Sequence, residues 1–130
     1  MIGSNLVTKR MQAYAGNYTS RYGKITEITV HHCAGIMSID DLGRLWQRVG
    51  REGSSHYGVS GTQIGQYVSE DDIAWTNSHW ASNCRAVTIE TSNSGGAPGR
   101  WLMIRCKPSS SWGQTLHGAT ACTLLCWARH

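Results

Sequence analysis

Residues 25–32 read ITEITVHH and carry the clearest strand pattern in the chain. β-Branched residues dominate the stretch, and apolar Ile28 and Val30 alternate with polar Thr29 and His31. This alternation is typical of a β-strand with two different faces. Successive side chains of a strand point to opposite faces, so the two histidines that end this stretch serve different sides of the sheet.

Residues 39–50, IDDLGRLWQRVG, have the spacing of an amphipathic helix. Their apolar positions recur every three or four residues and share one helical face. Ser38 is a suitable N-cap, and Asp40 and Asp41 suit the positive end of the helix dipole. Gly50 is the predicted C-terminal stop.

The other regular elements complete the prediction of an α/β fold. Residues 56–59 and 64–68 flank a polar turn and predict a β-hairpin. Residues 86–91, AVTIET, predict another strand, with Glu90 on the face opposite Val87. The order strand, helix, hairpin, strand predicts a single domain with a central mixed β-sheet flanked by helices.

Length and composition limit the class of protein. The chain has 130 residues, 40% hydrophobic and 15% charged, which fits one domain with one core. It contains no apolar run long enough to span a membrane, and its first residues lack the apolar core of a signal peptide. Five cysteines without a C-x-x-C pair predict free thiols in a reducing compartment. No sequence feature indicates an oligomer, so we expect a monomer.

The net charge of +4 arises entirely from residues 99–130. Residues 1–98 hold eight basic and eight acidic residues, whereas the final stretch holds four basic residues and no acidic one. Four charges over this length are sparse, and no recognition motif accompanies them. The sequence therefore argues against nucleic-acid binding.

Two polar side chains on strands could carry chemistry. An imidazole at the end of a strand, as at His31 or His32, can ligate zinc or can be a satisfied structural histidine. Glu90 is the acid in an otherwise apolar and β-branched strand, where a carboxylate is unfavourable unless it forms a salt bridge or has a function. Both alternatives stay open for each residue.

Three further residues invite a functional interpretation. Trp75 and Trp80 bracket a polar loop and could hold a sugar or a peptide, or could simply pack. Cys33 follows the histidines, but a catalytic cysteine needs a base and an electropositive setting. The sequence favours a small buried residue at this strand end.

Four motifs occur in a recognisable order: VHHCAG at 30–35, SSHYGV at 54–59, IGQYVSEDDIAW at 64–75 and CRAVTIETSN at 84–93. In these motifs the chain resembles the zinc-dependent N-acetylmuramoyl-L-alanine amidases of the type 2, peptidoglycan-recognition-like fold, in particular the phage endolysin and autolysin branch. The resemblance covers about residues 5–98. It implies a mixed sheet flanked by helices, Zn²⁺ as cofactor and bacterial cell-wall peptidoglycan as partner.

The resemblance also implies roles for single residues. His31 falls on the family's first zinc ligand, and His32 is the neighbour that faces away. Glu90 falls on the carboxylate that acts as general base toward water activated by zinc. Trp75 falls on an aromatic at the edge of the substrate groove. Some branches have a catalytic tyrosine where this chain has Ser55, which implies a variant that depends on the glutamate.

Residues 99–130 depart from the family pattern, so we expect the amidase domain to occupy residues 1–98 and the remainder to be an atypical basic tail. His117 and Cys122 look like remnants of the missing zinc ligands, at shorter spacing. Alternatively, a reading-frame shift begins just after Pro98: restoring one base there permits a reading that forms an amphipathic helix of the family's type. With ligands missing, we predict weak zinc binding and low stability.

The resulting functional hypothesis is a peptidoglycan hydrolase that cleaves the amide bond between N-acetylmuramic acid and L-alanine of the stem peptide. A non-catalytic or inactivated peptidoglycan-binding module is the alternative. An unrelated small metal-binding domain, matching by chance, is a third hypothesis. The expected location is that of a phage or prophage endolysin, cytoplasmic until it is released to the cell wall.

Overall fold

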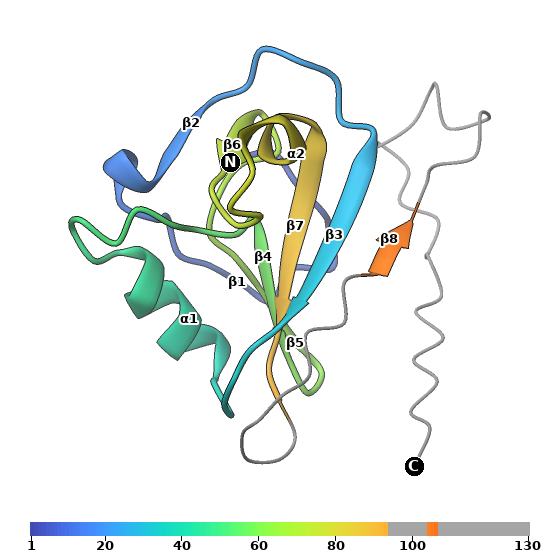
Figure 1. Cartoon of the computed structure of the whole chain (residues 1–130). Helices are drawn as coiled ribbons and strands as arrows, with labels where there is room; N and C mark the ends of the chain where they lie inside the picture. Colours follow the sequence, from blue (N-terminus) through green and yellow to red (C-terminus); the bar gives the residue numbers. More distant parts are fainter. Residues whose placement is uncertain (94–103, 107–130) are drawn as a thin grey trace.

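The computed structural model describes residues 1–93 and 104–106, and these form an α/β fold around a central mixed sheet (Figure 1). β7 runs parallel to both β4 and β3, β1 runs parallel to β5, and the pairs β4–β5 and β3–β8 are antiparallel. This arrangement confirms the predicted fold class. In spatial order the strands are β1 (Lys9–Arg10), β5 (Gln63–Gln66), β4 (Tyr57–Ser60), β7 (Ala86–Thr91), β3 (Glu27–His32) and β8 (Ile104–Cys106).

Several short elements were not predicted from the sequence. β2 (Tyr18–Ser20) pairs antiparallel with β6 (Asp72–Ala74) in a separate two-stranded sheet. A 3₁₀ turn, η1 (Ala15–Asn17), precedes β2, and the short helix α2 (Trp80–Arg85) leads directly into β7. The described residues contain no helix long and apolar enough to cross a membrane.

The helix α1 (Ile39–Trp46) begins at the predicted N-cap. The Asp41 amide donates to Ser38 Oγ over 3.1 Å, and the Ser38 amide donates back to the Asp41 carboxylate over 3.1 Å. The helix is shorter than predicted, because it ends at Trp46 and not at Gly50. Beyond this end the buried Asn17 amide donates to the carbonyls of Trp46 and Arg48, which a continuing helix would otherwise use.

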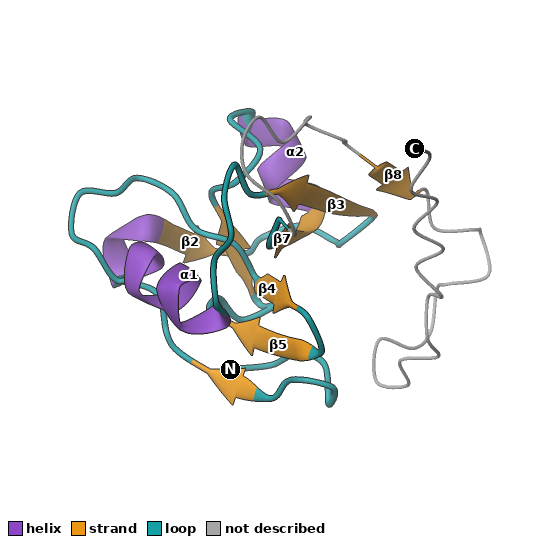
Figure 2. Ribbon diagram, turned by 90° about the horizontal axis from the view of Figure 1, so that it is seen from below, coloured by secondary structure: helices purple, strands orange, loops and turns teal. Residues whose placement is uncertain are grey.

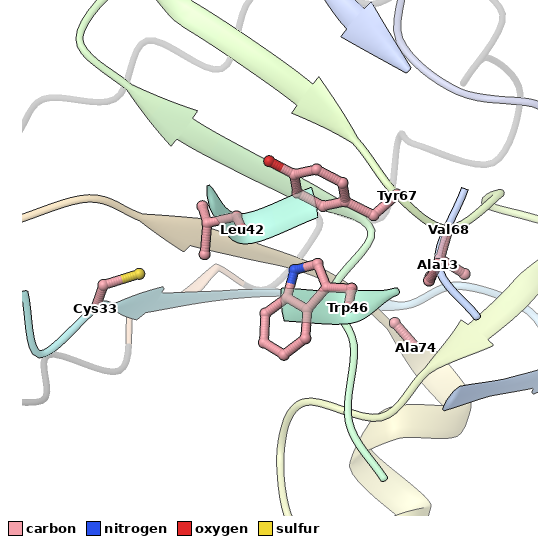
Figure 3. Close-up of a cluster of buried hydrophobic side chains, with 7 residues drawn as sticks. All are labelled: Ala13, Cys33, Leu42, Trp46, Tyr67, Val68 and Ala74. Atoms are coloured by element: carbon pink, nitrogen blue, oxygen red, sulfur yellow. The ribbon is translucent and has the colours of Figure 1, made fainter. Parts of the chain in front are cut away.

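The helix packs on one face of the sheet through a buried aromatic cluster (Figure 3). Leu42 and Trp46 of α1 meet Tyr67, whose hydroxyl donates to the Ile39 carbonyl over 2.7 Å. A side chain at Gly58 of β4 would lie 2.7 Å from Leu42 Cδ1, so glycine allows this close approach. The cluster comprises Ala13, Cys33, Leu42, Trp46, Tyr67, Val68 and Ala74. Figure 2 shows α1 and β8 at opposite sides of the molecule.

Candidate active site

The two predicted catalytic strands lie next to each other. β3 and β7 pair in parallel, and their register sets His31 opposite Glu90. Residues paired in register project to the same face of a sheet. The structure therefore brings the predicted zinc ligand and the predicted base together, whereas His32 falls on the other face, as expected from the alternation along the strand.

His31 is almost enclosed, with 8% of its surface exposed. Its Nε2 atom lies 2.7 Å from Oδ1 of Asn77, which belongs to the loop between β6 and α2. Within the described part of the chain, no hydrogen bond involves its Nδ1 atom. One ring nitrogen is thus held by an amide and the other is left without a protein partner there.

Glu90 has no counter-ion among residues 1–93: the salt bridges there join other pairs. Burial raises the pKa of its carboxyl above the ordinary value, opposed by the charge of His31 and a hydrogen bond from Cys33. In this part of the chain, the structural salt bridge that the sequence left open is therefore not formed. A partly buried carboxylate with a raised pKa is typical of functional sites.

Cys33 lies beside the carboxylate, with its Sγ atom 3.5 Å from Glu90 Oε2. Burial and the neighbouring Glu90 raise the pKa of the thiol to about 12. The thiol therefore stays protonated at neutral pH and donates to the carboxylate. This agrees with the interpretation of Cys33 as a small buried residue and not a nucleophile.

Ser55, at the position of the catalytic tyrosine of some branches, is fully buried. Its hydroxyl donates to the Tyr57 carbonyl over 2.6 Å. Next to it, His56 is also fully buried, and its Nδ1 accepts from the Thr88 amide over 3.1 Å. Neither side chain is available to a substrate.

Asn77 is the site residue that sequence reasoning missed. Its backbone amide donates to Asn83 Oδ1 over 2.8 Å, and its side-chain Nδ2 lies 2.9 Å from Ser82 Oγ and 3.4 Å from Thr29 Oγ1. In the sequence, the loop that carries Asn77 attracts attention only because Trp75 and Trp80 bracket it. An asparagine in a polar loop gives no sequence signal of contact with a strand 46 residues away.

A pocket of about 360 Å³ opens beside this loop, and Trp75 lines it as the substrate-groove prediction would require. Two residues that line the pocket, Glu52 and Ser78, adopt positive φ angles (54° and 50°). Such backbone is unfavourable for residues with side chains and tends to occur at functional sites. The lining residues are Glu52, Trp75, Ser78, His79, Trp80 and Asn83.

The residues described contain no group of three or more histidine, cysteine, aspartate or glutamate side chains able to hold a metal ion. They supply His31 and the carboxylate of Glu90. His117 and Cys122, the candidate remnant ligands, lie outside the described residues.

The described residues form a small α/β domain, and comparison with known families identifies its class. A family model described as N-acetylmuramoyl-L-alanine amidase matches residues 21–124. The chain therefore belongs to this family, and its family membership makes it a cell-wall amidase. The match continues past Pro98 into the segment that we expected to depart from the pattern. Among proteins with curated functions, none matches the chain.

Proposed function

We propose that the active site cleaves the amide bond joining the lactyl group of N-acetylmuramic acid to L-alanine of the stem peptide, with His31 as a zinc ligand and Glu90 as general base. The observation that carries the proposal is the register of β3 and β7. It sets an enclosed imidazole beside a half-buried carboxylate that forms no salt bridge in the described part of the chain.

The described residues supply one ligand of the proposed zinc site, His31, and do not by themselves hold a metal ion. A metal-ligating histidine usually donates a hydrogen bond from its second ring nitrogen to an oxygen acceptor. In His31 the Nε2 atom lies 2.7 Å from Asn77 Oδ1, which can act as such an acceptor. The remaining ligands would have to come from residues 94–130. When bound, zinc supplies a Lewis acid that polarises the amide carbonyl.

Glu90 would move the proton that amide hydrolysis requires. Its Oε2 accepts from the Cys33 thiol, whereas no hydrogen bond within residues 1–93 engages Oε1. Oε1 can therefore take a proton from the attacking water and return it to the departing amine. Partial burial raises the pKa of this carboxyl above its ordinary value, as suits a general base.

Trp75 would contact the substrate from the wall of the adjoining pocket. An indole face packs well on sugar rings and on peptide side chains. Trp80, of the same lining, has 51% of its surface exposed and extends the aromatic surface outward. Saccharide and stem peptide are both present in the proposed substrate.

We further propose that this is a chain of the phage endolysin type whose reading frame shifts after Pro98. The order of the four motifs supports the first point. The second rests on the sequence of residues 99–130, which lacks the family's ligand pattern although the family match extends to residue 124. The gene's nucleotide sequence tests it directly: if no single-base change restores an open frame there, the frame-shift proposal is wrong.

The experiment for the activity compares two proteins on purified cell walls, with and without zinc. One is the 130-residue chain, and the other comes from the gene with one base restored after the Pro98 codon. Turbidity is expected to fall with the restored protein and zinc. His31→Gln should abolish the effect, whereas His32→Gln, its neighbour on the opposite face, should not.

Each outcome decides between the hypotheses. Lysis by the 130-residue chain, stopped by a chelator, would make His117 and Cys122 credible ligands and would contradict the frame shift. Wall binding without lysis by both proteins would favour the peptidoglycan-binding module and would contradict the amidase proposal.

A further inference from the structure

The hydrogen bond between His31 and Asn77 is the end of a chain of polar contacts across the site. Asn77 Nδ2 lies 2.9 Å from Ser82 Oγ, and the Ser82 hydroxyl makes a long 3.5 Å contact with Glu27 Oε2. The other carboxylate oxygen, Glu27 Oε1, accepts from Arg85 Nε over 2.7 Å. The contacts thus run from Arg85 at the end of α2 to the imidazole on β3.

The direction of these hydrogen bonds follows from the carboxylate at one end. An ionised carboxylate can only accept, so the 3.5 Å contact with Glu27 Oε2 favours an orientation in which the Ser82 hydroxyl points its single proton toward Glu27. Ser82 Oγ is then the acceptor for Asn77 Nδ2, and Asn77 turns its carbonyl oxygen toward the histidine. An amide oxygen can only accept, so His31 must present an N–H at Nε2.

We propose that Asn77 is a positioning residue that holds His31 in the Nε2–H tautomer, so that Nδ1 carries the lone pair offered to a divalent metal. This inference rests on the proposed function for the metal, whereas the tautomer itself is a property of the protein without metal. The Asn77 loop is fixed independently of the histidine, because Asn83 Oδ1 accepts from the Asn77 backbone amide over 2.8 Å. The acceptor is therefore in place before any metal binds.

The alternative orientation of the amide breaks this chain. If Asn77 were reversed, its oxygen would need the Ser82 proton, and Glu27 Oε2 would lose its donor from Ser82. Nδ2 would then face a lone pair at Nε2, and the imidazole would carry its proton at Nδ1. The two orientations therefore predict opposite tautomers of His31.

The test is a long-range ¹⁵N–¹H correlation spectrum of the metal-free 130-residue chain with labelled histidines, recorded where the imidazoles are neutral. The spectrum of His31→Gln identifies the signals of His31. The wild-type chain should show the Nε2–H pattern. Asn77→Leu, which removes the acceptor at similar size, should shift His31 toward the Nδ1–H form. Asn77→Asp keeps an oxygen acceptor and should preserve Nε2–H.

A second variant tests the orienting contacts without touching Asn77. Ser82→Ala removes the hydroxyl between Asn77 and Glu27 and should raise the Nδ1–H population of His31. An Nδ1–H pattern in the wild-type chain would overturn the proposal, as would a tautomer unchanged by Asn77→Leu. Zinc titration of the frame-restored protein gives a separate readout: Asn77→Leu should weaken binding by about 10- to 100-fold relative to the same protein with Asn77. Failure of zinc to bind at all would count against the metal function but not against the tautomer.

Discussion

His31 and Glu90 are register partners on two adjacent parallel strands, so both side chains project to the same face of the sheet. The strands place the two residues, and Asn77 of the loop between β6 and α2 adds a contact of 2.7 Å to His31 Nε2. Gly58 of β4 is paired with Glu90 on the other side, and its missing side chain leaves room for α1 over the same face. The site is thereby built on paired strands of the central sheet.

Replacing Glu90 should separate activity from stability. Burial raises the pKa of Glu90, so its ionised form destabilises the folded state at neutral pH. Glu90→Gln should therefore be more stable than wild type toward urea at pH 7. The stability advantage of Glu90→Gln should shrink as pH falls from above the raised pKa of folded Glu90 to below its ordinary pKa. At that low pH the Glu90 side chain is neutral in both the folded and the unfolded state. A variant less stable at pH 7 would contradict this account of the carboxylate.

The same substitution should abolish catalysis in any form of the chain that lyses walls. Loss of a general base typically lowers the rate by about 10²- to 10⁴-fold. Turbidity assays with Glu90→Gln and with Asp71→Asn compare the strand carboxylate with an exposed one that takes no part in the site. Comparable lysis by both variants would remove Glu90 from the reaction.

His56 should make the fold sensitive to mild acid. Burial lowers its pKa to about 4, against 6.5 for an ordinary histidine. Between these values the unfolded chain binds the proton more readily than the folded one, so stability falls as pH drops from 6.5 to 4. The full effect is roughly 3 kcal/mol, at about 1.4 kcal/mol per pKa unit. The free energy of unfolding, measured with urea, should fall steeply between pH 6.5 and pH 4 for wild type. For His56→Gln it should change less over the same range.

Gly58 should tolerate no side chain. A Cβ atom there would lie 2.6 Å from the Tyr67 hydroxyl and 2.7 Å from Leu42 Cδ1. Gly58→Ala should destabilise the fold by about 1–3 kcal/mol through overpacking. Gly35→Ala is the matched control, since a Cβ atom there meets nothing within 4 Å. Equal unfolding midpoints for the two variants would show that α1 does not press on this strand.

The aromatic lining of the pocket should contribute to wall binding more than to folding. Trp80 is 51% exposed, so Trp80→Ala should alter stability little while it weakens binding to purified walls in a pull-down assay. Tyr14→Ala removes an aromatic of similar exposure outside the lining residues. Weaker binding by the Tyr14 variant alone would place the substrate on another surface.

The elements with strong local patterns were predictable from the sequence. The alternation in β3 and β7 and the capped amphipathic face of α1 are local signals, and they also identified His31 and Glu90 as candidates. The end of α1 was missed because it is set by Asn17, which precedes the helix by more than twenty residues. Asn77 was missed for the same physical reason, since its partner His31 is 46 residues away.

The most direct measurement of the central claim is the kind of chain end released from purified walls by the frame-restored protein with zinc. The account predicts new free amino groups of L-alanine without new reducing sugar ends. It also predicts their loss in His31→Gln and Glu90→Gln and their retention in His32→Gln. Release of reducing ends, or release unaffected by Glu90→Gln, would contradict the assignment of β3 and β7 as the site of amide hydrolysis.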